Sequence, residues 1–364
     1  MRVIIAAGGT GGHIYPGIAV AREILRREAK SEVMFVGTER GLENKLVPQA
    51  GFALSVIDSA GLKNVGLVAR LRGLMLIPRS IFAARCVIRK FRPDLVIGAG
   101  GYVSGPVVLA AALMKVPTLV MESNALPGFT NRRLARFVDK AAVSFDAALP
   151  YFGSKGVVTG NPVRREFFEI APRLRNATGK REFSILIFGG SQGARAINEA
   201  MVAALPLLDG LRDELRITHQ TGEADFEKVR SAYADAGWGE SADVRRYIDD
   251  MVATFAEADL VICRAGATTT AELIAAGKAA LMVPFPLAAD DHQRKNAEAL
   301  ADAGAARMIL QPELSGERLA QELATLAREP ERISAMAQAA RALTRGDAAA
   351  AVVDLVEELV SGKQ

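Results

Sequence analysis

Three glycine-rich segments are the clearest sign of chemistry in this sequence. They cover residues 8–12, 98–105 and 189–193, and each follows a run of apolar residues. Glycine lets backbone N–H groups approach an anion, and a helix that begins there adds a favourable dipole. We therefore expect the segments to bind phosphate groups, with Ser191 at the N-cap of the helix after the third one. The alternative is that each only allows a strand and a helix to pack closely.

The spacing of these glycines excludes two common nucleotide-binding motifs. A dinucleotide fingerprint would need glycine at Ile14 if it began at Gly9, and at Val103 if it began at Gly98. A Walker motif, with its G-K-[ST] ending, does not occur in the chain. The segments therefore argue against a dinucleotide-dependent enzyme and against a Walker-type ATPase.

His13 directly follows the first glycine-rich segment and is a candidate general base, because histidine titrates near neutral pH. The alternative is a structural hydrogen bond at the start of a helix. His219 and His292 make no H-E-x-x-H motif with it, and the sequence has no D-x-D. We therefore expect neither a metal site nor a cofactor. The two cysteines, Cys86 and Cys263, exclude a disulfide framework, and we expect both to be small core residues.

The elements that position these residues follow a repeated pattern of apolar strands and helices. With 364 residues, 50% of them hydrophobic, the chain is long enough for about two globular domains. The expected strands are non-alternating apolar runs with helices between them, which is typical of parallel sheets covered on both faces. They lie at residues 3–7, 32–37, 94–98, 118–122, 183–190, 217–219, 260–263 and 280–284. We expect an α/β protein of two doubly wound domains that join near Gly160 and face a cleft, with a helical tail from Pro330.

Two stretches bear on membranes. Residues 95–114 are uncharged and long enough to span a bilayer, but their glycines favour a strand, a loop and a helix. Between Asp58 and Asp94 there is no acidic residue, and eight of the 45 basic residues lie there, so the rest of the chain is net acidic. This basic, apolar segment is typical of attachment to an anionic membrane surface. Its predicted contacts are Arg70, Arg72, Leu74, Met75, Ile77, Arg79, Ile81, Phe82 and Arg85.

Two other interpretations of this segment are open: a core-facing helix with solvated arginines, and a nucleic-acid surface. Base stacking needs aromatic side chains, which are almost absent here, so we expect no nucleic-acid partner.

Seven short blocks, in order, resemble the MurG-type glycosyltransferase family of bacterial peptidoglycan synthesis. They are GGTGGHIYPG at 8–17, ESNALPG at 122–128, GNPVR at 160–164, FGGSQGA at 188–194, YIDDM at 247–251, CRAGA at 263–267 through Glu272, and DDHQ at 290–293 with Asn296. The resemblance implies the GT-B fold, with an acceptor and membrane domain at 1–160, a donor domain at 161–339 and a helix near 340–364 packing back on the first domain. It also implies peripheral binding at the cytoplasmic face of the inner membrane.

The resemblance further implies inverting transfer of N-acetylglucosamine from UDP-N-acetylglucosamine to undecaprenyl-diphospho-muramoyl-pentapeptide (lipid I). Glu272 would bind the ribose hydroxyls, the backbone of Ile248 would meet the uracil, and His13 would be the base, a role that Glu122 or Asp291 could share. The other implied donor contacts are Thr10, Gly11, Gly12, Asn124, Arg164, Ser191, Ala267, Thr268, Thr269, Thr270, Ala271 and Gln293, and the implied acceptor contacts are Gly101, Tyr102 and Glu122.

Two other functions remain to be separated from this one. A UDP-N-acetylglucosamine 2-epimerase would need no membrane segment and no lipid-facing loop, and the two N-terminal glycine-rich segments with His13 argue against it. The intact donor blocks argue against a non-catalytic protein that binds a nucleotide sugar or a lipid diphosphate.

Overall fold

The computed structural model describes the whole chain except residues 40, 60–66, 173–181, 191 and 363–364, and the side chains of residues 67–75. Contacts within the chain define two compact units. Unit 1 comprises Met1–Arg164 together with Arg345–Gln364, and unit 2 comprises Arg165–Thr344. Each unit contains one sheet, and neighbouring strands of the described residues run parallel in both sheets.

Unit 1 is built on a seven-stranded sheet of order β3-β2-β1-β4-β5-β6-β7. Its strands are β1 (Arg2–Ala7), β2 (Glu32–Gly37), β3 (Ala53–Val56), β4 (Leu95–Gly100), β5 (Thr118–Glu122), β6 (Lys140–Val143) and β7 (Gly156–Val158). Its helices are α1 (Gly11–Arg27), α2 (Glu43–Gln49), α3 (Leu67–Phe91), α4 (Ser104–Leu113), α5 (Phe129–Leu134) and α13 (Ala348–Ser361), with 3₁₀ turns η1 (Asp146–Tyr151) and η2 (Gly153–Lys155).

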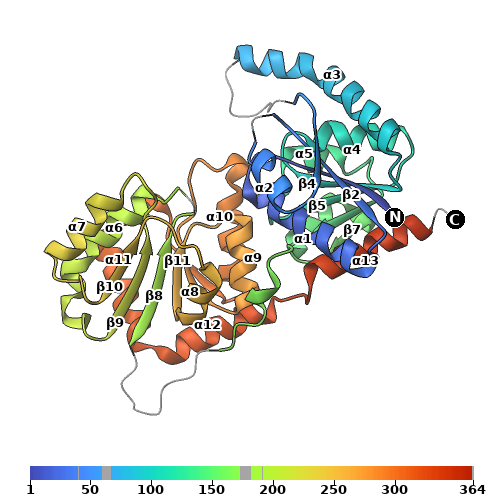
Figure 1. Cartoon of the computed structure of the whole chain (residues 1–364). Coiled ribbons are helices and arrows are strands. Elements are labelled where there is room, and N and C mark those ends of the chain that lie inside the picture. Colours follow the sequence, from blue (N-terminus) through green and yellow to red (C-terminus); the bar gives the residue numbers. More distant parts are fainter. Residues whose placement is uncertain (40, 60–66, 173–181, 191, 363–364) are drawn as a thin grey trace. The chain divides into compact units, whose positions relative to one another are not determined.

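Alternate side chains of the central strands fill two apolar layers. Val3 and Ile5 belong to the layer formed with α1 and α13, whereas Ile4 belongs to the layer formed with α3, α4 and α5. Figure 1 shows these two groups of helices on opposite faces of the sheet. Because successive side chains of a strand face opposite sides, a sheet covered on both faces needs continuous apolar strands. This explains why the central strands could be predicted from the sequence.

Unit 2 repeats the architecture with a six-stranded sheet of order β10-β9-β8-β11-β12-β13. Its strands are β8 (Phe183–Phe188), β9 (Leu215–Gln220), β10 (Ala242–Arg245), β11 (Leu260–Cys263), β12 (Ala279–Met282) and β13 (Ala306–Met308). Its helices are α6 (Arg195–Ala204), α7 (Phe226–Asp235), α8 (Met251–Glu257), α9 (Ala267–Ala276), α10 (His292–Asp302), α11 (Gly316–Arg328) and α12 (Pro330–Ala342), with 3₁₀ turns η3 (Arg165–Phe167), η4 (Leu205–Leu211), η5 (Ala289–Asp291) and η6 (Gln311–Glu313).

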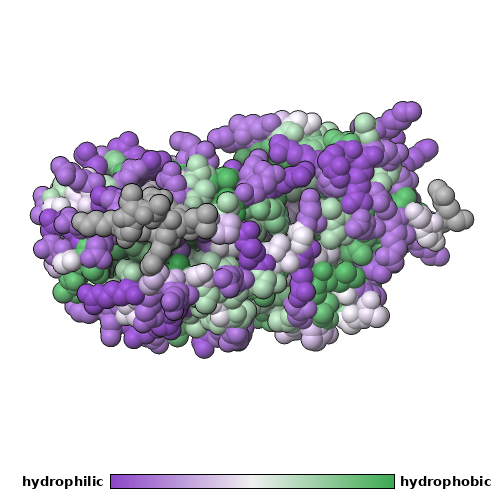
Figure 2. Space-filling model, turned by 90° about the horizontal axis from the view of Figure 1, so that it is seen from below, coloured by the Kyte–Doolittle hydropathy of each residue, from purple (hydrophilic) through white to green (hydrophobic). Residues whose placement is uncertain are grey.

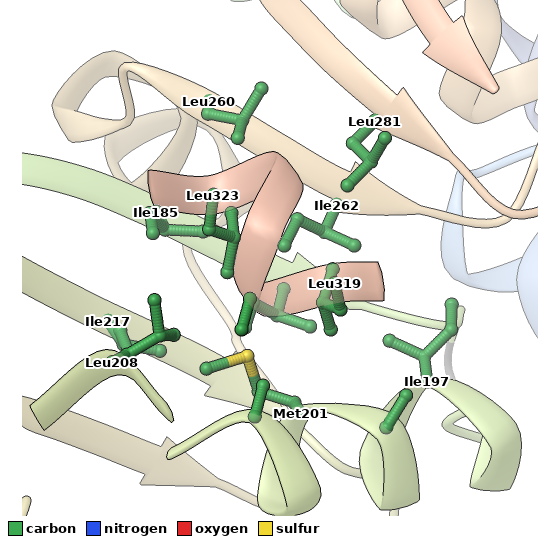
Figure 3. Close-up of a cluster of buried hydrophobic side chains, with 14 of the residues drawn as sticks. Ile185, Ile197, Met201, Leu208, Ile217, Leu260, Ile262, Leu281, Leu319 and Leu323 are labelled. Atoms are coloured by element: carbon green, nitrogen blue, oxygen red, sulfur yellow. The ribbon is translucent and has the colours of Figure 1, made fainter. Parts of the chain in front are cut away.

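The main core of unit 2 lies between its sheet and helices α6 and α11. Figure 3 shows Ile185, Ile262 and Leu281 of the strands meeting Met201 of α6 and Leu323 of α11. All five side chains are at most 1% exposed. Burying such a side chain stabilises the fold by about 1.5–3 kcal/mol, so this layer holds the loops of unit 2 on a rigid base.

The expectation of two parallel-sheet domains is confirmed, and residues 95–114 form β4, a loop and most of α4, as predicted. Within the described part of the chain, no helix combines the length and apolar character needed to cross a bilayer. The tail is helical as expected. Cys263 is buried, but Cys86 lies exposed on α3, so the expectation of two core cysteines is wrong for Cys86.

In both sheets the strand order reverses beside the first strand of the unit. The reversal lies between β1 and β4 in unit 1 and between β8 and β11 in unit 2. In open α/β sheets, ligands bind outside the carboxyl ends of strands at this point. The three glycine-rich segments follow β1, β4 and β8, so the fold places each of them at such a position.

Candidate active site

The first glycine-rich segment connects β1 to α1. Gly9 has a φ of +89°, a conformation that favours glycine, and Thr10 is the exposed N-cap of α1. Gly11, Gly12 and His13 form the first turn of the helix. The N–H of His13 donates to the carbonyl of Thr10 (3.1 Å), whereas the N–H groups of Gly11 and Gly12 come before the first acceptor of the helix. The backbone here is therefore suited to binding an anionic group.

The second glycine-rich segment packs tightly against the first. Gly100 and Gly101 have φ values of +117° and +81°. A side chain at Gly100 would clash with the ring of His13, and one at Gly101 would clash with the carbonyl of Gly8. The structure thus places His13 beside Gly100, and Gly101 beside Gly8. Tyr102 follows directly and is 58% exposed.

Glu43, which the sequence analysis missed, holds the first glycine-rich segment in place through the backbone of Gly9. Its fully buried carboxylate accepts hydrogen bonds from the N–H of Gly9 (3.0 Å) and from the N–H and hydroxyl of Thr38 (2.8 and 2.7 Å). Burial alone would raise the pKa of Glu43, but these hydrogen bonds outweigh it and hold the pKa below its ordinary value. A charged Glu43 uses the Gly9 N–H, so an anion would bind to the later N–H groups.

Glu122 has a similar task in the loop after β5. Its Oε1 accepts hydrogen bonds from the backbone N–H and the side-chain amide of Asn124, and its Oε2 accepts them from Gly128 and Asn131. Burial raises the pKa of the Glu122 carboxyl, and these four donors counteract the rise. Glu122 therefore positions Asn124, and its predicted direct contact with the acceptor, or its use as base, has no direct support from this geometry.

The GNPVR block closes unit 1. Asn161 is buried and accepts a hydrogen bond from the hydroxyl of Ser123 (2.9 Å), which ties this block to the loop that carries Asn124. Arg164 is exposed. Its long cationic side chain suits a phosphate group.

The third glycine-rich segment connects β8 to α6. Gly190 and Gly193 have φ values of +101° and +75°, and the N–H of Gly193 donates to the carbonyl of Gly190 (3.0 Å). The helix begins at Arg195 with Ala194 at its N-cap, so the expected N-cap position of Ser191 is wrong. Ser191 itself lies outside the described residues.

The segment after β10 carries Ile248. Its side chain is 2% exposed and belongs to the core, while its N–H donates to Oε1 of Gln220 (2.7 Å). Because this N–H is used by Gln220, the carbonyl is the remaining polar group of Ile248 that a ligand could contact, and its role toward the uracil stays a prediction. Gln220, at the carboxyl end of β9, was missed; its place at the end of a strand was the available signal.

Helix α9 begins at Ala267 after the N-cap Gly266, as predicted. The N–H groups of Ala267, Thr268 and Thr269 lie in its first turn, where a helix has no acceptors of its own and favours an anion. Thr270 is different: it is buried, and both its N–H and its hydroxyl donate to the carbonyl of Gly266 (2.9 and 2.8 Å). Both donors of Thr270 are thus used inside the helix, and its contact with the donor substrate stays a prediction. Ala271 follows within the helix, beyond the first turn.

Glu272 lies on α9, and Gln293 lies in the first turn of α10. Glu272 is half-buried on α9, and its negative charge adds to burial in raising the pKa of the Cys263 thiol. Gln293 begins α10 and accepts the N–H of Phe285 at its Oε1 (3.0 Å), so its NH₂ group is the end available for another partner. Arg264 holds the same loop by donating to the carbonyls of Val283 and Pro284 (3.1 and 3.2 Å).

On α3, the structure describes the second half of the predicted membrane segment. Arg79, Phe82 and Arg85 are exposed, and Phe82 is 70% exposed. Ile77 is half-buried, and Ile81 packs against the core of unit 1, so the expectation that Ile81 faces a membrane is wrong. The side chains of Arg70, Arg72, Leu74 and Met75 lie outside the described residues. Figure 2 shows a different face of the molecule, seen from below, on which hydrophilic residues are interspersed with hydrophobic ones.

A basic hollow of about 500 Å³ on unit 1 was not foreseen. Arg132, Arg133, Arg136 and Lys155 line it together with Ala135, Tyr151 and Phe152. Helix α5 carries Arg132 and Arg133 and packs on α4, which in turn packs on α3. The hollow therefore adds positive charge to the same layer of helices as the α3 face.

A metal centre has no basis among the residues that the structure describes, because they contain no group of three or more His, Cys, Asp or Glu side chains able to hold an ion. The candidate site thus consists of backbone N–H groups, a histidine, carboxylates and amides.

Comparisons with known proteins agree with this arrangement. Residues 3–143 match the glycosyltransferase family 28 N-terminal domain, and residues 184–357 match its C-terminal domain. A UDP-N-acetylglucosamine–N-acetylmuramyl-(pentapeptide) pyrophosphoryl-undecaprenol N-acetylglucosamine transferase of Anaeromyxobacter sp. (strain Fw109-5) is 50% identical over 99% of this chain and 94% of its own. A relative with the same name from Geobacter sulfurreducens is 47% identical over 97% of both chains.

Solved structures support the same family. The crystal structure of MurG from Acinetobacter baumannii has a TM-score of 0.82 and 36% identity, covering 98% of this chain and 99% of that one. A UDP-N-acetylglucosamine 2-epimerase from Neisseria meningitidis reaches a TM-score of 0.70 at 17% identity, covering 98% and 100% of the two chains, and so shares only the fold. This chain therefore belongs to glycosyltransferase family 28, is a MurG-type glycosyltransferase and has the GT-B fold.

Proposed function

We propose that this enzyme transfers N-acetylglucosamine from UDP-N-acetylglucosamine to the 4-hydroxyl of the muramoyl sugar of lipid I, giving lipid II with inversion at the anomeric carbon. The observation that carries the proposal is the identity of 47–50% over at least 97% of this chain with relatives named for that reaction. Glycine-rich loops at the strand-order reversals of both sheets suit a reaction in which both substrates are diphosphates.

The donor-binding groups of this proposal lie mainly on unit 2. The first turn of α9, with the N–H groups of Ala267, Thr268 and Thr269, and the loop at Gly190 would bind the diphosphate. Glu272, a pure acceptor when ionised, would bind both ribose hydroxyls, and the backbone of Ile248 would meet the uracil. Gln293 would donate its NH₂ group to a sugar hydroxyl, because its carbonyl oxygen already accepts from Phe285.

Unit 1 would bind the acceptor and supply the base. His13 takes the proton from the 4-hydroxyl as its oxygen attacks the anomeric carbon, and the bond from that carbon to the β-phosphate breaks. UDP leaves with the electron pair, and its new charge is stabilised by Arg164 and by the helix N-terminus. Asn124, held by Glu122, would bind the donor sugar, and Thr10, Gly11, Gly12, Gly101 and Tyr102 would lie near the reacting groups.

The membrane is the second part of the proposal. We infer that the enzyme binds peripherally to the cytoplasmic face of the plasma membrane, through the exposed face of α3. Arg79 and Arg85 flank the exposed Phe82 on one side of the helix, while Ser80, Ala84 and Ile88 are buried on the other. Cations beside an outward aromatic ring favour an anionic headgroup layer. The acceptor is a membrane lipid, which gives this attachment a purpose.

Transfer is tested by incubating the protein with radiolabelled UDP-N-acetylglucosamine and a lipid I analogue, followed by separation of lipid-linked and soluble label. Lipid-linked label supports the proposal. Soluble epimer, or unchanged donor in the presence of both substrates, would overturn it in favour of the epimerase or of a non-catalytic protein.

A further inference from the structure

Gln220 joins two parts of unit 2 that the proposed function assigns to different portions of the nucleotide. It is the last residue of β9 and is 1% exposed. Its Nε2 donates to the carbonyl of Gly190 (2.9 Å), and its Oε1 accepts the N–H of Ile248 (2.7 Å). A carbonyl can only accept and an N–H can only donate, so these partners fix which end of the amide faces which segment.

The loop at Gly190 also packs closely on the residues that follow Gln220. A side chain at Gly193 would clash with the carbonyl of Thr221, and one at Gly222 would clash with the carbonyl of Gln192. The glycine-rich loop therefore lies directly against the end of β9. Within this contact, the Gln220 amide is the buried side-chain link from the loop onward to the segment at Ile248.

We propose that Gln220 is a positioning residue that holds the diphosphate loop and the nucleobase segment at a fixed spacing, so that a nucleoside diphosphate is bound as one unit. This inference rests on the proposed assignment of these two segments to UDP. Gln220 touches no ligand atom in this scheme. When two binding segments are held at a fixed spacing, a ligand that contacts both binds more tightly, because less conformational freedom of the protein is lost on binding.

The test compares UDP, UMP and uridine as ligands of the wild-type enzyme and of Gln220→Leu, by calorimetry. Leucine keeps the apolar volume but loses both hydrogen bonds. We expect UDP to bind about 10- to 100-fold more weakly, with uridine affected much less, because the advantage of the joined ligand is lost. In turnover, KM for UDP-N-acetylglucosamine should rise while kcat at saturation stays close to the wild-type value.

Ile217→Ala is the matched control. Ile217 lies on the same strand and is 2% exposed, so this change removes apolar packing from β9 without touching the Gln220 amide. The control should lose stability but keep the ratio of UDP to uridine affinity. Equal losses of UDP and uridine affinity in Gln220→Leu, which leave the ratio of the two affinities as in the wild type, would overturn the proposal.

A second variant covers the case in which Gln220→Leu fails to fold. Gln220→Met keeps the length of the side chain, adds no charge and loses both hydrogen bonds. We expect it to retain uridine binding and to weaken UDP binding, as Gln220→Leu should. Unchanged UDP binding in this variant would contradict the inference, whereas a wild-type enzyme that binds no UDP would instead contradict the proposed function.

Discussion

Two buried carboxylates stabilise loops of the candidate site by accepting hydrogen bonds from them. Glu43 holds the Gly9 N–H, and Glu122 holds the backbone and side chain of Asn124. Neither group is exposed to solvent; Glu43 also accepts two hydrogen bonds from Thr38, and Glu122 accepts two more from Gly128 and Asn131. Such contacts give a glycine-rich loop a defined shape that glycine itself does not provide.

For His13, we expect replacement by alanine to lower kcat by about 10²-fold or more, which is the usual scale for a positioned general base. Donor affinity should be nearly unchanged, because the proposed donor contacts lie mainly on unit 2. Single-turnover rates and UDP-N-acetylglucosamine binding would be measured on the same preparation. A His13→Ala enzyme with wild-type turnover would show that another group removes the proton.

For Glu272, we expect Glu272→Ala to weaken UDP binding by about 10- to 100-fold, since it removes charge-assisted hydrogen bonds to two hydroxyls. The comparison ligand is 2′-deoxy-UDP, which lacks one of those hydroxyls. Wild type should prefer UDP over the deoxy ligand, and the variant should lose most of that preference. A preserved preference would exclude Glu272 as the ribose contact.

Individual residues were predictable where a short block carries them and less so where packing decides. Thr270 and Ile81 were assigned to ligand and membrane, but one bonds to Gly266 and the other packs into the core. Sequence spacing shows which residues share one side of a helix, but whether that side is buried depends on the elements that pack against it. Glu43 and Gln220 act through loops far from them in sequence, so local pattern gave them no role.

At the scale of elements, burial decided which strands could be predicted. The central strands appear as apolar runs, whereas β3, β7, β10 and β13 lie at sheet edges and are short or partly polar, and β6 is a short alanine-rich strand. An edge strand has fewer neighbours to pack against, so its sequence is less constrained to be apolar. The site was predictable because it depends on the central strands.

Helix α3 supports a prediction about membrane binding. The double variant Arg79→Gln with Arg85→Gln should bind vesicles rich in anionic lipid roughly 30-fold more weakly, at about 1 kcal/mol for each charge near the surface. Co-sedimentation with vesicles measures this, and neutral vesicles give the baseline.

The matched control removes the same charge elsewhere, through Arg22→Gln on α1 and Arg328→Gln on α11. It should bind anionic vesicles nearly as wild type does. Equal losses in the two double variants would attribute attachment to net charge and not to α3.

At the scale of the whole molecule, the chain leaves unit 1 after Arg164 and returns to it at Arg345. Arg27 of α1 donates to Asp354 and Glu357 of α13 and to the carbonyl of Ala350 (2.7, 3.0 and 2.9 Å). Val352, Val353 and Val356 of α13 are fully buried in the core of unit 1. Helix α13 is thus part of unit 1, so the core of unit 1 can form completely only after α13 has been synthesised.

The stability of unit 2 should depend on pH through His219. This histidine is fully buried between Tyr233 and Asn198, and burial lowers its pKa from 6.5 to about 3. Asn198 donates its NH₂ group to Thr221 and Asp225, so its oxygen accepts from Nε2 of His219, and Nδ1 accepts from the Tyr233 hydroxyl. The bond at Nδ1 requires the neutral ring, whereas Nε2 donates to Asn198 in either protonation state.

Because the native pKa lies below that of the unfolded chain, the stabilising effect of a neutral His219 is complete above pH 6.5. It is lost as pH falls from 6.5 toward 3, by about 1.4 kcal/mol per unit, or about 2 kcal/mol between pH 7 and pH 5. Trp238 is the single tryptophan, is buried in unit 2 and reports unfolding in urea by its fluorescence. His219→Gln keeps a donor and an acceptor without a titrating ring, so its loss over this range should be smaller by that amount. Ile217→Ala removes apolar packing from the same strand but leaves His219 intact, so it should retain the wild-type slope. Identical slopes in all three proteins would assign the pH dependence to other groups.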